Sequence, residues 1–126
     1  MDNSRKSGLI GDELMDLGSV RIADEVIASI AGIATMDVPG VVGMSSGLIG
    51  GMAEMMGKKS TSKGVKVQVG AREVAVDLYI VVEYGLRIPA VALQVQEKVK
   101  EAVETATGLT VLEINVHVQG VGFSPG

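Results

Sequence analysis

Apolar residues recur along this chain at two spacings, and each spacing predicts a different type of element. Intervals of three and four residues indicate a helix with one apolar stripe, whereas alternation indicates a strand with one apolar face. In chain order, the pattern predicts a strand at 18–23, a helix from Asp24 to a break at Pro39 and Gly40, a short strand beginning at Val41, a hairpin of strands 65–69 and 73–83, a helix at 88–106 and a strand at 111–119.

Local signals support both predicted helices. Asp24 and Glu25 place negative charge in the first turn of the first helix, where the helix dipole favours it. Pro89 suits the first turn of the second helix, and Gly108 is a natural C-terminal cap for it. In the last strand, one alternating set of apolar residues should face the core: Leu112, Ile114, Val116 and Val118.

Each predicted strand has one apolar face and each helix has one apolar stripe, so both helices can cover the same face of a single sheet. The expected fold is therefore an α+β two-layer sandwich, with a mainly antiparallel sheet and two helices packed on one face. We expect a flexible N-terminal leader at 1–17, a single domain at 18–123 and a tail at 124–126. Within the domain, a long loop rich in Gly, Met and Lys spans 43–64.

Composition restricts the chemistry that this domain can carry. The chain has 126 residues, no cysteine and a single histidine, His117, which excludes disulfides and Cys-based metal sites. Its formal net charge of -4 provides no general attraction to nucleic acid or anionic lipid. Acidic residues interrupt any signal-peptide core near the N-terminus, and no apolar run has the length of a membrane-spanning helix. We therefore expect a cytoplasmic protein.

The strand positions that alternate with the core positions predict an open face of the sheet. This face should carry both polar and less polar side chains, namely Asp77, Tyr79, Val81, Glu83, Val111, Glu113, Asn115 and His117. Exposed apolar and aromatic residues on a sheet favour self-association or the docking of a partner. We assign the interaction surface to Tyr79, Val81, Val111, Glu113 and His117.

An enzymatic interpretation of the same face rests on Asp77, Glu113 and His117. Carboxylates and a histidine are the residue types of general acid-base catalysis, but that chemistry needs pKa values tuned by burial. No feature of the sequence predicts a pocket around them. We therefore expect no enzymatic activity, no small-molecule substrate and no cofactor.

The long loop supports two further hypotheses. Its apolar residues resemble an adaptable surface for a partner or a lid on the core, and they are Leu48, Ile49, Met52, Met55 and Met56. Gly47 and Gly50 match the GXXG spacing with which KH domains clamp an RNA backbone, and Lys58, Lys59 and Lys63 follow. The loop otherwise lacks the aromatic residues on which bases stack, so nucleic-acid binding is the alternative and not the leading hypothesis.

Several motifs in order resemble the alkaline shock protein family, the envelope stress response family of Gram-positive bacteria. The resemblance covers about residues 18–123 and rests on Gly18-x-Val20-x-Ile22-Ala23, Val38-Pro39-Gly40-Val41, Lys63-Gly64-Val65-Lys66-Val67, Val76-Asp77-Leu78-x-Ile80-Val81-Val82-Glu83-Tyr84-Gly85, Ile88-Pro89 and Val116-His117-Val118-Gln119-Gly120-Val121. It implies a self-associating, non-enzymatic scaffold or adaptor, peripheral at the inner face of the plasma membrane. A membrane-embedded relative or another membrane anchor would hold it there, and its role would be in cell-envelope homeostasis under stress.

Overall fold

The computed structural model describes residues 17–45 and 63–123, and within them a sheet is built around one central strand. This strand is β3 (Glu73–Glu83), and β4 (Thr110–Gly122) pairs with it in parallel along its whole length. The other edge of β3 is shared by two short antiparallel strands. There β2 (Val65–Val69) pairs with residues 74–78, and β1 (Val41–Met44) pairs with residues 80–82.

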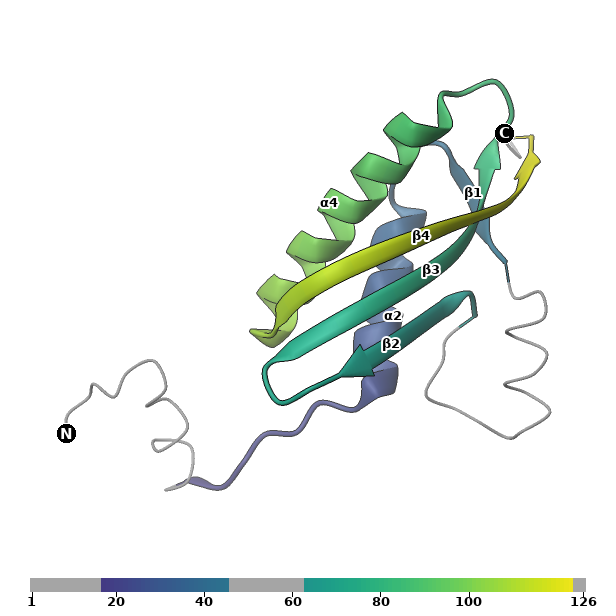
Figure 1. Ribbon diagram of the computed structural model, residues 1–126. Coiled ribbons are helices and arrows are strands. Elements are labelled where there is room, and N and C mark those ends of the chain that lie inside the picture. Colours follow the sequence, from purple (N-terminus) through teal and green to yellow (C-terminus); the bar gives the residue numbers. More distant parts are fainter. Residues whose placement is uncertain (1–16, 46–62, 124–126) are drawn as a thin grey trace.

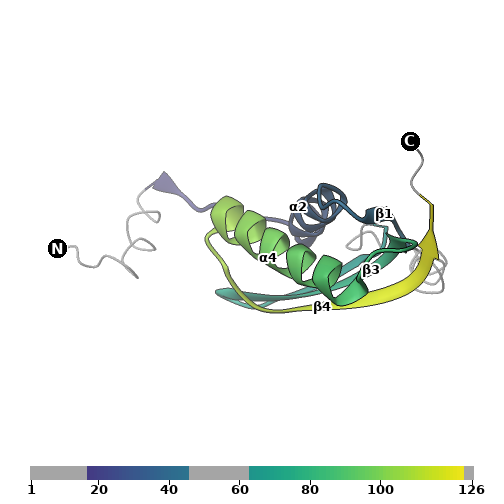
Figure 2. The same ribbon diagram turned by 90° about the horizontal axis from the view of Figure 1, so that it is seen from above.

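Two helices cover one face of this sheet and leave the other face open (Figure 1; Figure 2). Helix α2 (Asp24–Met36) contacts β1 and β2, helix α4 (Ile88–Thr107) contacts β4, and the two helices contact each other. The predicted α+β two-layer fold is therefore confirmed, together with both helices on one face and the mainly antiparallel sheet.

Alternating residues of β3 form the centre of the core. Their side chains are 0–1% exposed, and they are Val74, Val76, Leu78, Ile80 and Val82. Opposite them, α4 buries a valine at every fourth position from Val91 to Val103. Burial of each such side chain stabilises the fold by about 1.5–3 kcal/mol, so these two rows contribute a large share of the apolar stabilisation.

The buried face of α2 consists mostly of small residues. The helix buries Ile27 and the small residues Ala28, Ala31 and Ala34, whereas Val26 is 49% exposed and Ile33 is 72% exposed. Small side chains bring the helix axis close to the sheet: a Cβ atom on Gly32 would lie 3.5 Å from a Val65 methyl group. Because the helix lies close to the sheet, its alanine face is the one that packs against the core. The larger residues are also spaced as a stripe, but they remain exposed.

The predicted strand at 18–23 is wrong. These residues belong to no strand, Val20 is 72% exposed, and Ala23 is the extended N-cap of α2. Both edges of β3 are already paired with other strands, so a strand here would have only an outer edge to join. Alternation over six residues is too little to provide that partner.

The start of the last strand is also predicted wrongly. Val111 pairs with Val74 and Glu113 pairs with Ala75, so Leu112 is the extra residue of a β-bulge. A bulge shifts the alternation by one residue. Val111, predicted on the open face, is therefore buried with 6% exposure, and Leu112, predicted in the core, is 61% exposed. From Ile114 to Val118 the predicted alternation agrees with the pairing.

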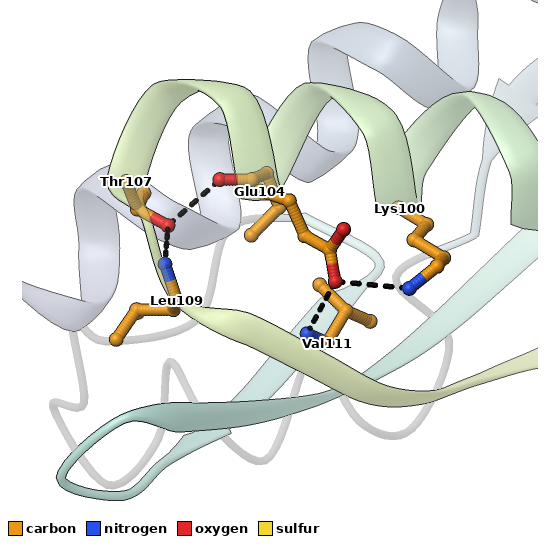
Figure 3. Close-up of polar contacts among 6 residues, drawn as sticks. Lys100, Glu104, Thr107, Leu109 and Val111 are labelled. Atoms are coloured by element: carbon orange, nitrogen blue, oxygen red, sulfur yellow. Dashed lines mark hydrogen bonds and ion pairs between the residues drawn. The ribbon is translucent and has the colours of Figure 1, made fainter. Parts of the chain in front are cut away.

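Side chains of α4 accept hydrogen bonds from the backbone of the segment that connects α4 to β4 and from the start of β4 (Figure 3). The Val111 N–H donates to Glu104 Oε2 over 2.9 Å, and Lys100 Nζ donates to the same oxygen over 2.9 Å. The Leu109 N–H donates to Thr107 Oγ1 over 3.1 Å. The Val111 N–H and then Lys100 hold the pKa of the Glu104 carboxyl below its usual value of 4.5.

The end of β1 and the start of β2 meet at one residue of β3, Tyr79. The Ser45 N–H donates to the Tyr79 carbonyl, and the Tyr79 N–H donates to the Gly64 carbonyl, each over 2.8 Å. Gly64 has φ +73°, and a Cβ there would lie 2.9 Å from both the Met44 Cβ and the Tyr79 carbonyl oxygen. This junction therefore requires glycine both for its backbone conformation and for space.

We predict that Gly64→Ala destabilises the domain more than Gly108→Ala does. Gly108 has a similar φ of +78°, but a Cβ there would meet no atom within 4 Å, so its variant experiences only the conformational cost. That cost is about 1 kcal/mol, and the crowding at Gly64 adds at least as much again. Urea unfolding of both variants measures the difference. Equal free energies of unfolding would contradict the crowded junction.

We also predict that Glu104→Gln lowers stability at neutral pH and has a diminishing effect as the pH falls below about 4.5. The lowered pKa means that the carboxylate stabilises the folded state above its unfolded pKa, and this contribution is lost as the group is protonated. Thermal unfolding from pH 7 to pH 2.5 tests this. Glu101→Gln, an exposed carboxylate of the same helix, is the control, and a constant difference between the Glu104 variant and wild type across this range would contradict the prediction.

Candidate functional site: the open face of the sheet

The face of β3 that lies away from the helices presents Asp77, Tyr79 and Val81. Their register partners on β4 are Asn115, His117 and Gly120. All six residues are partly exposed, whereas Leu78 and Ile80, which lie between them on β3, are fully buried. Strand alternation and sheet pairing thus place residues about forty positions apart in sequence side by side.

His117 is the centre of this face. Its Nε2 atom lies 3.1 Å from Asp77 Oδ1, and its ring stacks on Tyr79 with 4.4 Å between ring centroids and an interplanar angle of 10°. The imidazole is therefore held by a carboxylate at one edge and by a phenol ring against its face. Two contacts of this kind fix its orientation on the sheet.

Burial, and then the nearby Asp77 carboxylate, raise the pKa of Tyr79 above its usual value of 10.0. The phenol therefore keeps its proton at physiological pH and offers an O–H donor next to an aromatic surface. A ring with an apolar body and a polar tip suits a protein interface.

Polar pairs surround the stacked rings. Asn115 Nδ2 donates to Glu113 Oε2 over 3.2 Å, and Ser45 Oγ donates to Gln119 Oε1 over 3.3 Å. Glu113 is exposed and Asn115 is partly exposed, so both keep hydrogen-bonding capacity toward solvent or a partner.

Val81 forms the apolar part of the face. Its register neighbours are Gly43 on β1 and Gly120 on β4, so no side chain stands beside it on either strand. A Cβ on Gly122 would contact both Val42 and Val81, at 3.6 and 3.7 Å. The directly paired neighbours of Val81 thus carry no side chain, and the side chains near it, such as Val42, make this part of the face apolar.

Four of the residues predicted to form an interaction surface are together on this face, namely Tyr79, Val81, Glu113 and His117. Val111 is not among them, because the bulge at Leu112 turns it into the core. The remaining predicted residues Gly47, Leu48, Ile49, Gly50, Met52, Met55, Met56, Lys58 and Lys59 lie outside the described residues. Lys63 is exposed and lines a hollow of about 550 Å³ with Ile33, Met36 and Met44 of α2 and β1.

Sequence reasoning missed two features of the surface. Tyr84 and Phe123 are 66% and 80% exposed, and their rings pack 5.7 Å apart at the end of β3 and β4. The second feature is that the directly paired neighbours of Val81 carry no side chain. The glycines were visible in the sequence, but only the register shows that they flank one valine.

The His117 and Asp77 pair has the groups of a general acid-base dyad, yet it lies on an open surface with 42% and 25% of the two side chains exposed. A partly exposed pair contributes about 0–1 kcal/mol to folding, far less than the buried core of β3. The fold therefore does not depend on the dyad. Within residues 17–45 and 63–123, no group of three or more His, Cys, Asp or Glu residues is arranged to hold a metal ion.

Comparison with known proteins identifies relatives over most of this chain. The uncharacterized protein YqhY of Bacillus subtilis (strain 168) is 43% identical over 107 residues, which are 85% of this chain and 79% of YqhY. YloU of the same organism is 42% identical over 106 residues, 82% of this chain and 88% of YloU. A stress response regulator gls24 homolog of Streptococcus pyogenes serotype M3 is 36% identical over 102 residues, 80% of this chain and 57% of that protein.

Solved structures named MamM CTD have a similar chain trace at 17% identity, with a TM-score of 0.48 over 76% of this chain and 93% of one such chain. In the described part of the protein, neither helix has the length and apolar character needed to cross a membrane. The model of a protein family with a cell envelope-related function matches residues 13–123. The chain therefore belongs to that family, the ASP23 or alkaline shock protein family.

Proposed function

We propose that this protein is a non-enzymatic scaffold or adaptor of the cell-envelope stress response, which acts at the cytoplasmic face of the membrane. Its family has a cell envelope-related function, and stress response regulator homologs are among its relatives. The observation that carries the proposal is the open sheet face, where Tyr79, His117 and Val81 are partly exposed and neither helix covers them.

This face has the properties of a docking surface. Its residues stand on β3, which is paired along both edges, and on β4, which pairs with β3 along its length, so a partner would meet a preformed platform and lose little affinity to ordering it. The stacked Tyr79 and His117 rings provide an aromatic anchor, and the apolar part of the face around Val81 provides apolar contact. Asp77 and Glu113 add acceptors around this centre.

The membrane role would depend on a partner. In this proposal a membrane-embedded relative, or another membrane anchor, binds the open face and holds the domain at the bilayer, while further copies of the chain assemble with it. Recognition would involve shape and hydrogen bonds and not charge attraction to anionic lipid, since the chain has a net charge of -4.

We predict that Tyr79→Glu and Val81→Glu each reduce recovery of the protein with cell membranes at least several-fold. Each variant introduces a charge at the centre of the docking surface, where an interface would have to desolvate it. The test separates membranes from the soluble fraction of cells that express each variant, with and without a salt wash and RNase. Circular dichroism and the melting temperature confirm that each variant is folded.

Gln94→Glu is the matched control, because it adds the same charge to an exposed position of α4, on the other side of the sheet. It should leave membrane recovery unchanged. Membrane recovery of both central variants at the wild-type level would overturn the docking surface. Release of the wild-type protein by RNase would instead favour the nucleic-acid alternative, for which Lys63→Glu is the next variant in the described part of the chain.

A further inference from the structure

The two edges of the sheet differ in length and regularity. One edge consists of the two short strands β1 and β2, with four and five residues. The other edge is β4 alone, with thirteen residues, and its only strand partner among the described residues is β3. Short, interrupted edge strands discourage pairing with another chain, whereas a long one provides a template for it.

The first part of the β4 edge is occupied by side chains of α4. Glu104 accepts from the Val111 N–H, and Gln96 Nε2 donates to the Ile114 carbonyl over 3.0 Å (Figure 3 shows the first of these contacts). Both contacts lie on the side of β4 away from β3. The bulge at Leu112 and the charge of Glu113 also interrupt this part of the edge.

The next part of the edge has no such protection in the described structure. Alternate residues of a strand direct their backbone groups to opposite sides, so Val116 and Val118 face outward as Ile114 does. Neither has a hydrogen bond on that side with another described residue. Residues 114–118 are regular up to the second bulge, at Gln119, and they contain no Lys, Arg, Asp, Glu or Pro.

We infer that the β4 edges of two copies of this chain pair antiparallel about a twofold axis at Val116. This inference specifies the self-association that is part of the proposed function. In this register Val116 lies opposite its own copy, Ile114 lies opposite Val118, and Asn115 lies opposite His117 of the second copy. The Ile114 carbonyl accepts from Gln96 with one lone pair, and in the dimer it accepts from the Val118 N–H of the second copy with the other. Apolar residues meet apolar residues on the helix side, and hydrogen-bonding residues meet on the open side.

The self-complementary residues of 114–118 favour a second copy as the occupant, since apolar residues meet apolar residues and Asn115 meets His117. Two chains of net charge -4 repel each other over most of their surfaces, but two copies of an uncharged segment meet without like charges opposite each other. The pairing is isologous and closes as a dimer, and the bulges at Leu112 and Gln119 restrict it to a short stretch. Both open faces remain free for the docking described above.

Crosslinking tests the register, because the natural chain has no cysteine. The variant Asn115→Cys/His117→Cys places two cysteines opposite each other on the two copies, at non-hydrogen-bonded positions where Cα atoms are about 4.5 Å apart and a disulfide can form. Under mild oxidation we expect most of the protein to run as a covalent dimer. The matched control is Lys66→Cys/Gln68→Cys, two exposed positions at the same spacing on β2, and it should crosslink at least five-fold less. Equal crosslinking of the two variants, or none in either, would overturn the inference.

A second variant tests the hydrogen bonds of the edge. Val116→Pro removes an N–H that faces away from β3, which an edge strand tolerates, so the domain should stay folded while the dimer is lost. Light scattering should give a mass near twice 13.0 kDa for the natural chain and near 13.0 kDa for the variant. A natural chain that is monomeric at high concentration, or a folded proline variant that remains dimeric, would contradict the edge dimer.

The outcomes also separate this inference from the proposed function. A Val116→Pro protein that is monomeric but still recovered with membranes would support the edge dimer and leave the docking surface intact. If the natural chain is monomeric but membrane recovery depends on Tyr79 and Val81, only the edge dimer is wrong. A third outcome is that the dimer is confirmed but both the edge variant and the Tyr79 and Val81 variants are still recovered with membranes. That outcome would support the edge dimer and overturn the scaffold proposal.

Discussion

The structure depends on the two-sided pairing of β3. With β4 along one edge and β1 and β2 along the other, the backbone of this strand is hydrogen-bonded on both sides, and its side chains must alternate between a fully buried and a partly exposed face. The buried set, Val74 to Val82, determines where α2 and α4 can pack. The exposed set then forms an open surface, because both helices pack on the other face of the sheet.

The proposed function rests on this division between the faces. Aliphatic residues form the core, and each of the three aromatic residues is at least partly exposed: Tyr79, Tyr84 and Phe123. Aromatic residues contribute strongly to interfaces, so a chain with so few of them that keeps them out of its core is better suited to recognition than to enclosing a substrate. The dyad of Asp77 and His117 fits the same interpretation, because it orients an aromatic ring on an open surface.

The two bulges of β4 connect the core to the proposed assembly. The first turns Val111 inward and Leu112 outward, and the second isolates the regular stretch that ends at Val118. Side chains of α4 bond to the edge at Val111 and at Ile114, so the same helix that covers the core also determines where the open part of the edge begins. In the proposed assembly, this domain would therefore present a face for a partner and an adjoining edge for its own copy.

The sequence by itself determined the elements whose signals are local. Alternation along 65–69 and 73–83, the valine spacing of α4 and the cap at Gly108 depend only on neighbouring residues, and they correctly predicted the hairpin, the helix and the two-layer fold. Tertiary structure alone decided the rest. The parallel pairing of β3 with β4 set the bulge that buries Val111, occupation of both β3 edges excluded a strand at 18–23, and close packing chose the alanine face of α2. Each of these outcomes is a competition between distant segments for one edge or one space, and no local pattern of residues records which segment wins.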